Sequence, residues 1–349
     1  MPIGLVTSCW SGQRVEAFSS PEALADATCG GTRPAEKGNV FQEANTAVVA
    51  ADSIHHDRLE KDIFDFDEGL GIDPTQLWNA MIHPLLPMRF VGVAWYQGEA
   101  NSGNATAYAC RFPAMITDWR VKFSLPDLSF FDVQLAGSFE GNGAEIRAAQ
   151  DAALQLPGVG VAIAADLGDP TSPAGAVHPR RKQEVGRRLA LNARVLRYGE
   201  RGGLVYEGPV LDSVEFTRFG AILGYRPGTA DGLHLKGTAE CTGCCFVSPF
   251  EVLDSFGKWT RAEATILHGQ KIMLECTDPI LGIRLNWECC PQCAVYNGSG
   301  GPDDHAGLPA ALFEWCAYPT GDAPWTGMAC DTSPRVKSAG STRTRGSIS

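Results

Sequence analysis

Three groups of polar residues stand where this chain could do chemistry. A carboxylate, a histidine and an amide donor are the three parts of an acyl-transfer site, because they orient the base, accept a proton and bind the developing oxyanion. Each group lies at or near the end of an apolar run. In chain order they are Gln97, Gly98, Glu99 and Asn101; then Asp166 and Asp169; then His178.

The histidine stands just before a helical pattern. Residues 179–198 place apolar side chains on one face, and Pro179 suits the first position of a helix. We therefore expect His178 to be the helix N-cap or its neighbour. The positive end of a helix favours neutral imidazole, which a general base requires near pH 7.

Each group also has an ordinary explanation. A single histidine before a helix is commonly a capping or loop residue. Asp166 and Asp169 could form the turn before Pro170, and Gln97 could bond its own loop. The hypothesis of an ester site rests on the combination, and it lacks a nucleophile. No G-x-S-x-G motif occurs. Serines follow the first apolar run at positions 8, 11, 19 and 20, and Ser11 is the strongest candidate among them.

The elements that must position these residues alternate in type. Apolar runs predict strands at residues 3–9, 90–96, 129–135 and 159–165. Helical patterns occupy residues 75–82, 105–123, 144–154 and 179–198. Strands that are apolar on both faces and separated by helices describe a parallel sheet in an α/β fold. Ligands bind at the carboxyl ends of such strands, which is where the polar groups fall.

The sequence pattern changes near residue 208. Short strand patterns at residues 266–268, 271–274 and 282–285 alternate with Gly, Pro and Cys turns and predict a smaller β-rich domain, with a sandwich as one candidate. Residues 45–72 are expected to form a surface loop. The Ser/Thr/Arg/Gly-rich stretch 331–349 is expected to be disordered.

Charge and composition exclude several classes of partner. The 349 residues carry 29 basic and 40 acidic side chains, so the net charge is −11, which disfavours nucleic acid and anionic membranes. No apolar run reaches the roughly 20 residues of a membrane span. A P-loop, a G-x-G-x-x-G turn and an H-E-x-x-H motif are all missing, so we expect no cofactor.

The cysteines indicate an oxidising compartment. Eight of the twelve lie between Cys241 and Cys316, which is typical of a disulfide framework, with Cys245, Cys276, Cys289 and Cys316 as the expected partners. Glycosylation sequons begin at Asn104 and Asn297. A structural zinc site is the alternative, since Cys241-x-x-Cys244 and Cys290-x-x-Cys293 have ligand spacing. No signal peptide precedes these features.

Several motifs together resemble the sialate O-acetylesterases, which belong to the SGNH (GDSL-like) hydrolases. The similarity runs from residue 2 to about residue 320. The motifs that carry it are PIGLVTSCW (2–10), VEAFSS (15–20), LWNAMIHPL (77–85), WYQGEAN (95–101) and HPRRKQ (178–183). The resemblance implies a flavodoxin-like α/β core over residues 1–207, a Cys-rich β domain over 208–322 and a tail over 323–349. It also implies a secreted or lysosomal protein that removes O-acetyl esters from sialic acid or related sugars.

The resemblance assigns roles to single residues. His178 would be the catalytic histidine, Gln97 with Gly98 the oxyanion-side motif, and Glu99 the residue that holds this turn. Gly12 falls in a family segment, W-G-G-T, whose backbone donor helps to bind the oxyanion; here the segment is WSGQ. No Asp stands three residues before His178, so Asp166 or Asp169 is the candidate partner, or the site acts as a dyad.

The family nucleophile lies in a G-Q-S-N motif, on a segment before the part that matches residue 2. Neither Gly-Gln pair of this chain continues with serine. We therefore expect the chain to lack its nucleophile strand, as in a truncated gene product, and to have little or no turnover. The alternatives are a carbohydrate-binding protein without catalysis and a relative of the acetyl-xylan esterases.

Overall fold

The computed structural model describes residues 4–25, 29, 72–138, 143–200, 202–217, 220–236, 248–276, 280–291, 295–298 and 307–316. The predicted surface loop 45–72, apart from its last residue, lies outside these ranges, as do Cys241, Cys244, Cys245, Cys293 and the predicted tail. Within the described ranges, no helix is both long enough and apolar enough to cross a membrane.

A parallel sheet of three strands forms the centre of the first half. Its strands are β1 (Gly92–Trp95), β2 (Ser129–Gln134) and β3 (Val159–Ile163), in the order β1-β2-β3. These strands and their direction confirm the prediction of an α/β fold. The prediction of a strand at residues 3–9 is wrong for its described part, residues 4–9. These residues pair with no described strand, and a strand is stable only with a neighbour to complete its ladder.

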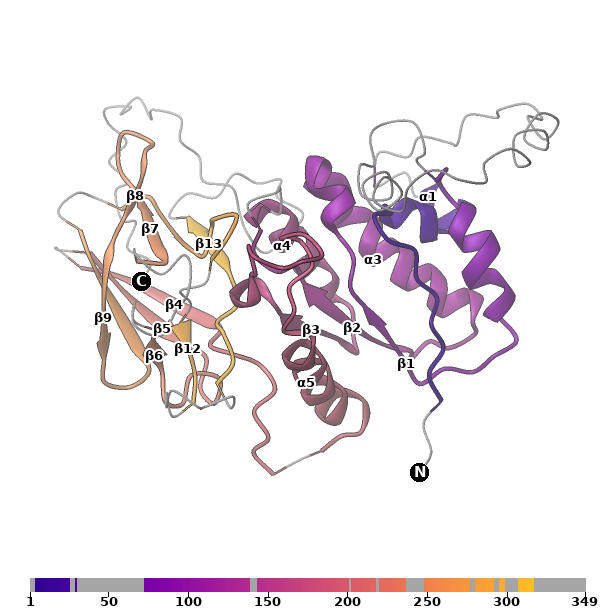
Figure 1. Ribbon diagram of the computed structural model, residues 1–349. Coiled ribbons are helices and arrows are strands. Elements are labelled where there is room, and N and C mark those ends of the chain that lie inside the picture. Colours follow the sequence, from indigo (N-terminus) through magenta and orange to yellow (C-terminus); the bar gives the residue numbers. More distant parts are fainter. Residues whose placement is uncertain are drawn as a thin grey trace, which may run out of the picture.

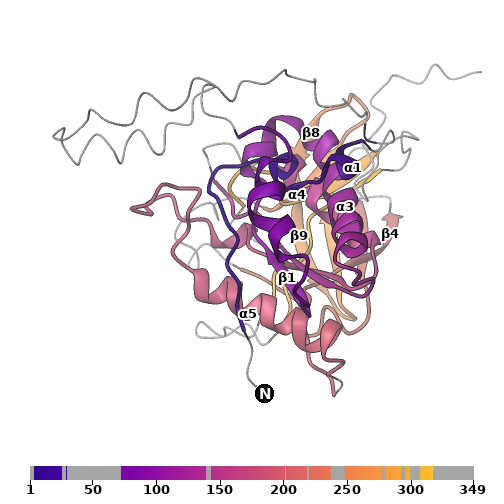
Figure 2. The same ribbon diagram turned by 90° about the vertical axis from the view of Figure 1, so that its right-hand side faces the viewer.

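Helices cover both faces of this sheet. Figure 1 shows α3 and α4 on one side of the strands and α5 on the other. The helical elements before β2 are η1 (Val15–Phe18), α1 (Pro21–Leu24), η3 (Trp78–Ile82), η4 (His83–Leu85), η5 (Glu99–Asn104) and α3 (Ala105–Lys122). Those after it are α4 (Ala144–Gln150), η6 (Asp151–Gln155), η7 (Ala165–Leu167), α5 (Lys182–Asn192) and η8 (Ala193–Arg197). Seen from the side in Figure 2, the first residues run past β1 from the α5 side to the α1 side.

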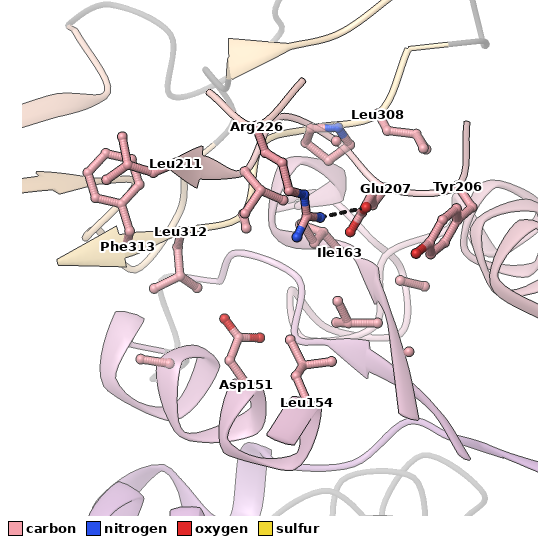
Figure 3. Close-up of a pocket in the computed structure, with 18 of the residues that line it drawn as sticks. Asp151, Leu154, Ile163, Tyr206, Glu207, Leu211, Arg226, Leu308, Leu312 and Phe313 are labelled. Atoms are coloured by element: carbon pink, nitrogen blue, oxygen red, sulfur yellow. Dashed lines mark ion pairs between the residues drawn. The ribbon is translucent and has the colours of Figure 1, made fainter. Parts of the chain in front are cut away.

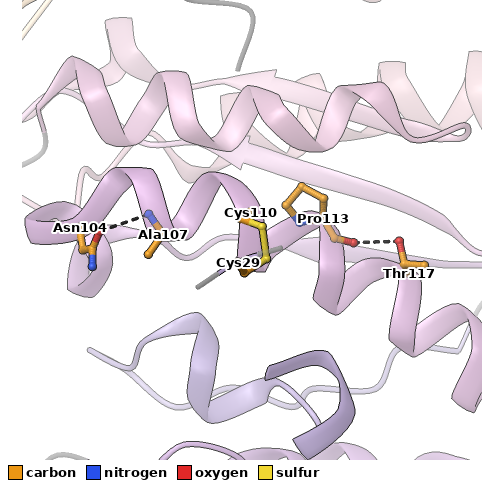
Figure 4. The surroundings of a disulfide bond; sticks show 6 residues. All are labelled: Cys29, Asn104, Ala107, Cys110, Pro113 and Thr117. Atoms are coloured by element: carbon orange, nitrogen blue, oxygen red, sulfur yellow. Dashed lines mark hydrogen bonds between the residues drawn. A yellow bond between two sulfur atoms is a disulfide. The ribbon is translucent and has the colours of Figure 1, made fainter. Parts of the chain in front are cut away.

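The α3 helix anchors the larger core. Asn104 caps it by accepting a hydrogen bond from the N–H of Ala107 at 3.2 Å (Figure 4). A disulfide joins Cys110 of this helix to Cys29. The aromatic ring of Trp95, from β1, stacks on Phe112 of α3 at 6.1 Å between ring centres. Apolar packing of α3 against β1 therefore fixes the strand whose end carries Gln97.

The α5 helix begins later than its sequence pattern indicates. Its first residue is Lys182 and its N-cap is Arg181, so the prediction that His178 caps this helix is wrong. The reason lies in the preceding turn. Arg180 binds the carboxylate of Asp169 through its N–H and its guanidinium, which holds the backbone in a turn until Lys182. The first residue of the helix therefore lies four positions after His178.

Antiparallel sheets make up the second half. One has the order β4-β5-β10-β9, another β13-β11-β7-β8, and a short one β12-β6. The strands are β4 (Leu211–Thr217), β5 (Gly220–Tyr225), β6 (His234–Leu235), β7 (Phe250–Leu253), β8 (Trp259–Arg261), β9 (Glu263–Leu267), β10 (Lys271–Glu275), β11 (Gly282–Leu285), β12 (Val295–Tyr296) and β13 (Phe313–Cys316). Leu223 and Ile272 of the first sheet share one core with Val252 and Ile283 of the second, so the two sheets form a sandwich.

The cysteines depart from the predicted framework. Cys276 and Cys289 are free thiols, so their expected disulfides are absent. Cys276 follows β10 and Cys289 follows β11, and these strands belong to different sheets. A disulfide requires Cα atoms within about 7 Å. Cys316 is disulfide-bonded.

The two sequons differ in accessibility. Asn104 is exposed, whereas Asn297 is 2% exposed. The amide nitrogen of Asn297 donates to the carbonyl oxygens of Glu207 and Thr229, at 2.9 and 2.8 Å. A glycan on Asn297 is therefore incompatible with this fold, while Asn104 can carry one and still cap α3.

Candidate active site

A cleft of about 470 Å³ lies where the N-terminal segment meets the carboxyl end of β1. Residues 8–13 form one wall, residues 94–97 with Glu99 and Ala100 form another, and Val177, His178 and Lys182 close it. The structure thus brings together residues that are up to 174 positions apart in sequence, from Ser8 to Lys182. Four of the predicted site residues line this cleft: Gly12, Gln97, Glu99 and His178.

Gln97 connects the walls of the cleft. Its amide nitrogen donates to the carbonyl oxygen of Gln13 at 3.0 Å and to the side-chain oxygen of Asn101 at 2.8 Å. Tyr108 donates its hydroxyl to the amide oxygen of Gln97 at 3.2 Å. Because both amide hydrogens are engaged, the side chain holds the N-terminal segment against β1. Its predicted role as an oxyanion donor stays a prediction.

Asn101 holds the same N-terminal segment through two further hydrogen bonds. Its side-chain oxygen also accepts the N–H of Val15 at 2.9 Å, and its amide nitrogen donates to Glu16 at 2.8 Å. Asn101 is buried, so these bonds are shielded from water and strengthened by the low local dielectric. Asn101 therefore acts as a structural support, which places the loop containing Gly12 at the cleft.

A backbone donor at this loop is open to a ligand. Gly12 has a φ of 68°, a left-handed conformation that favours glycine. Ser11 and Gly12 form a hydrogen-bonded turn, which the N–H of Gln13 closes, whereas the N–H of Gly12 has no backbone partner in the described part of the chain. A free backbone N–H at the wall of a cleft is suited to bind a developing oxyanion.

Gly98 permits the sharp turn after β1. Its φ is 153°, and a Cβ at this position would lie 3.1 Å from the side chain of Leu135. The turn begins η5 and brings Glu99 into the cleft. Burial raises the pKa of the Glu99 carboxyl, while backbone N–H groups and the charges of His178 and Lys182 act in the opposite direction. Glu99 is therefore the acidic side chain that shares the cleft with His178.

The loop that carries His178 is held by several hydrogen bonds. The N–H of His178 donates to the carbonyl of Gly175 at 2.9 Å, and its carbonyl accepts the hydroxyl of Ser172 at 2.6 Å. Asp169 and Arg180 close the loop with a two-point ion pair, at 2.6 and 2.7 Å. The hydrogen bonds from Arg180 keep the pKa of Asp169 well below its usual range. Asp169 thus positions the loop of His178 and does not line the cleft.

Asp166 is engaged elsewhere. Its carboxylate accepts hydrogen bonds from the guanidinium of Arg188 at 2.6 and 2.9 Å and from the hydroxyl of Tyr296 at 2.7 Å. Burial alone would raise its pKa, but the charge and hydrogen bonds of Arg188 keep the pKa below its ordinary value. Asp166 therefore links α5 to β12, and it is not among the residues that line the cleft.

A larger cavity of about 610 Å³ lies between β3 and the strands β4 and β13. Figure 3 shows Asp151 and Leu154 on one side, with Leu312 and the ion pair of Arg226 and Glu207 across from them. None of the predicted site residues lines this cavity. We assign the chemistry to the smaller cleft, because only that cleft combines a histidine, a carboxyl group and an open backbone donor.

The structure adds one cleft residue that sequence reasoning did not single out. Lys182, the first residue of α5, lies over the ring of Tyr96 at 4.5 Å. The sequence signal for Lys182 was its place in the HPRRKQ motif. A motif that resembles an enzyme family can contain functional residues besides its histidine.

Comparison with known proteins identifies relatives of this chain. Residues 73–194 match the sequence model of the family described as "Carbohydrate esterase, sialic acid-specific acetylesterase". The mouse sialate O-acetylesterase is 32% identical over 330 residues, and the human one is 32% identical over 339 residues. This chain belongs to the sialate O-acetylesterase family. The alignments include 85% and 89% of the chain.

The coverage of these sialate O-acetylesterases is partial. The chain spans 58% of the mouse protein and 57% of the human protein. A crystal structure of a carbohydrate acetylesterase from Xanthomonas citri aligns with 89% of the chain and 60% of its own, at 28% identity and a TM-score of 0.65. The family match contains every predicted site residue except Gly12.

Proposed function

We propose that the cleft around His178 hydrolyses an acetyl ester on a hydroxyl group of a sugar, with O-acetylated sialic acid as the substrate. The observation that carries this proposal is the cleft itself. In a member of a sialate O-acetylesterase family, His178, Glu99 and the open N–H group of Gly12 all line one cleft, which supports the proposal.

His178 is the general base in this proposal. It takes a proton from the attacking oxygen, which bonds to the acetyl carbon and pushes electrons onto the carbonyl oxygen. The tetrahedral intermediate then breaks its bond to the sugar oxygen, and the protonated His178 returns the proton to that leaving oxygen. Glu99, which faces the same cleft, stabilises the imidazolium during this cycle.

The backbone N–H group of Gly12 binds the oxyanion. Gln97 and Asn101 hold this donor in place through the hydrogen bonds to residues 13 and 15. Gln97 is thereby a positioning residue. Asp169 holds the loop of His178, and Asp166 holds α5 on the second half of the chain.

The attacking oxygen is that of water in this chain. Ser8 and Ser11 both line the cleft, but neither stands in a G-Q-S-N motif, and Ser8 donates its hydroxyl to the carbonyl of Met81 at 3.3 Å. Without a covalent nucleophile, the base and the oxyanion donor support only slow hydrolysis. In serine hydrolases that lack a member of the triad, the oxyanion donors and substrate binding alone retain a rate about 10³–10⁴-fold above that in water.

The scaffold and its surroundings form part of the same proposal. The three layers of helices and parallel sheet suit a flavodoxin-like SGNH core over residues 1–207, followed by a β domain over 208–322. The disulfide between Cys29 and Cys110 supports a secreted or lysosomal location, where thiols are oxidised.

Acetate release from O-acetylated sialic acid tests the proposed activity. We expect slow release that falls about 10²-fold or more in His178→Ala and is unchanged in His268→Ala, an exposed histidine outside the cleft. A serine-directed phosphonate should not inhibit it. Rapid turnover that the phosphonate abolishes would contradict the proposal, since it would show that a serine of this chain is the nucleophile.

A second candidate function is sugar binding without catalysis. The engaged hydroxyl of Ser8 and the missing motif favour it. It predicts saturable binding of O-acetylated sialosides with no release of acetate. The same experiment separates the two functions, because a rate above background that depends on His178 excludes a purely binding role.

A further inference from the structure

Lys182 places a cationic group at the edge of the cleft that contains His178. We propose that Lys182 binds the carboxylate of an acidic sugar and so selects such sugars over neutral acetylated ones. This inference rests on the proposed function, because it concerns the substrate of the same cleft.

The ammonium group is held in a defined place. Its nitrogen lies 4.5 Å from the centre of the Tyr96 ring, within the range of a cation–π contact. Tyr96 packs in turn against the apolar cluster between the sheet and α5. Lys182 is exposed as a whole residue. Partial burial of its ammonium group against the cleft nevertheless lowers the pKa of that group.

The ammonium group has no ion-pair partner in the described part of the chain. Its neighbours differ in this respect, since Arg180 pairs with Asp169, and Arg187 and Arg188 pair with Glu184. A cation at the first position of a helix also faces the positive end of the helix dipole, which disfavours it there. Apart from the charge of Glu99 in the same cleft, the local fold therefore gives Lys182 little stabilisation, and an anionic ligand would add to it.

The charge of the whole chain makes a local cation necessary for an acidic substrate. A net charge of −11 repels an anionic sugar at long range, so binding requires a positive group within the cleft itself. The charged side chains that line the described cleft are Glu99, His178 and Lys182. His178 faces the ester as the general base, so Lys182 is the cation left for a carboxylate.

Two separated contacts then define the substrate. The acetyl ester lies between His178 and the backbone donor of Gly12, while the carboxylate lies at Lys182, four residues further along the chain. A cleft of about 470 Å³ is within the range for a small ligand such as a monosaccharide. An acetylated neutral sugar, such as a xylose unit, would leave Lys182 without a partner.

A matched pair of ligands tests this inference by binding alone. The α-methyl glycoside of N-acetylneuraminic acid carries the carboxylate, and its C1 methyl ester is the neutral counterpart. Calorimetry or ligand-observed NMR would compare both ligands with the whole chain and with Lys182→Gln, Lys182→Arg and Lys258→Gln. Lys258 is exposed and lies in the turn between β7 and β8, so its variant controls for general loss of charge.

We expect the acid to bind the unmodified chain at least tenfold more tightly than its methyl ester. Lys182→Gln should remove this preference and leave binding of the ester within twofold, while Lys182→Arg and Lys258→Gln should retain the preference. Equal binding of acid and ester to the unmodified chain, no binding of either, or a preference that survives in Lys182→Gln would overturn the inference. Failure of the proposed hydrolysis would leave these binding results unaffected, so the two can fail separately.

Discussion

Replacement of Asp151 by Asn should change the pH dependence of stability. Asp151 is a buried carboxyl in η6, and it accepts one hydrogen bond, from the amide of Gln134 at 2.9 Å. Burial raises its pKa from 3.8 to about 7. Asparagine has nearly the same shape as the protonated carboxyl and keeps an oxygen for Gln134, so the variant resembles the neutral form at every pH.

The size of the effect follows from these pKa values. Between about pH 4 and pH 7, folded Asp151 retains a proton that the unfolded chain releases, so the stability of the unmodified protein falls as the pH rises. At about 1.4 kcal/mol for each pH unit, the loss reaches up to about 4 kcal/mol above pH 7. Asp151→Asn lacks this loss. It should match the unmodified protein near pH 4 and exceed its stability at pH 8.

Urea unfolding at pH 4.5, 6 and 8, followed by tryptophan fluorescence, measures this difference. Asp127→Asn is the matched control, because Asp127 is exposed on the loop before β2. Asp132, another buried acid, is present in all three proteins, but the charge of Asp151 adds to burial in raising its pKa, so the difference measures position 151 together with its coupling to Asp132. A difference between the Asp151 variant and the unmodified protein that does not grow with pH would refute this reasoning.

Three further substitutions test the structural supports of the site. Gly98→Ala should lower the free energy of unfolding by about 1–3 kcal/mol through backbone strain and crowding, measured by urea unfolding; no loss would contradict the assigned turn. Tyr296→Phe should cost about 1.5–3 kcal/mol, since it removes a buried hydrogen bond to the charged Asp166, and a neutral result would show that the bond is dispensable. Asp169→Asn should slow acetate release while leaving the melting temperature within a few degrees, because the exposed ion pair with Arg180 orders only the loop of His178.

Much of the α/β half could be predicted from the sequence. Apolar runs separated by helical patterns locate β1, β2, β3 and α3 to within a few residues, because burial on both faces leaves a strong periodic signal. The strand expected at residues 3–9 was not found, since an apolar run does not reveal whether a neighbouring strand is present to pair with it.

The candidate site could be predicted in part. The ends of the strands correctly indicated Gln97, Glu99 and His178 as neighbours in one cleft. The partners of the two aspartates could not be foreseen. Asp166 binds Tyr296 of β12, which is 130 residues away, and long-range pairing of this kind leaves no local pattern. The partner of Asp169 is Arg180, eleven residues along the same loop. The shape of this loop depends on their ion pair, so the sequence alone does not reveal the contact.

The helix start at Lys182 illustrates a different limit. Proline at position 179 is compatible with the first turn of a helix, so local propensity favoured an earlier start. The ion pair of Arg180 with Asp169 outweighed this preference. The consequence is functional, because it separates His178 from the helix and places Lys182 at the cleft.

The most direct test of the central claim is an NMR titration of the histidine side chains with O-acetylated sialic acid. The central claim is that the smaller cleft, and not the larger cavity near Asp151, holds the acetylated sugar against His178. Seven histidines give separable imidazole signals, and His178→Ala identifies the relevant one. The account predicts that the His178 signal shifts saturably while that of exposed His268 does not. Saturable binding that leaves the His178 signal unchanged would contradict it.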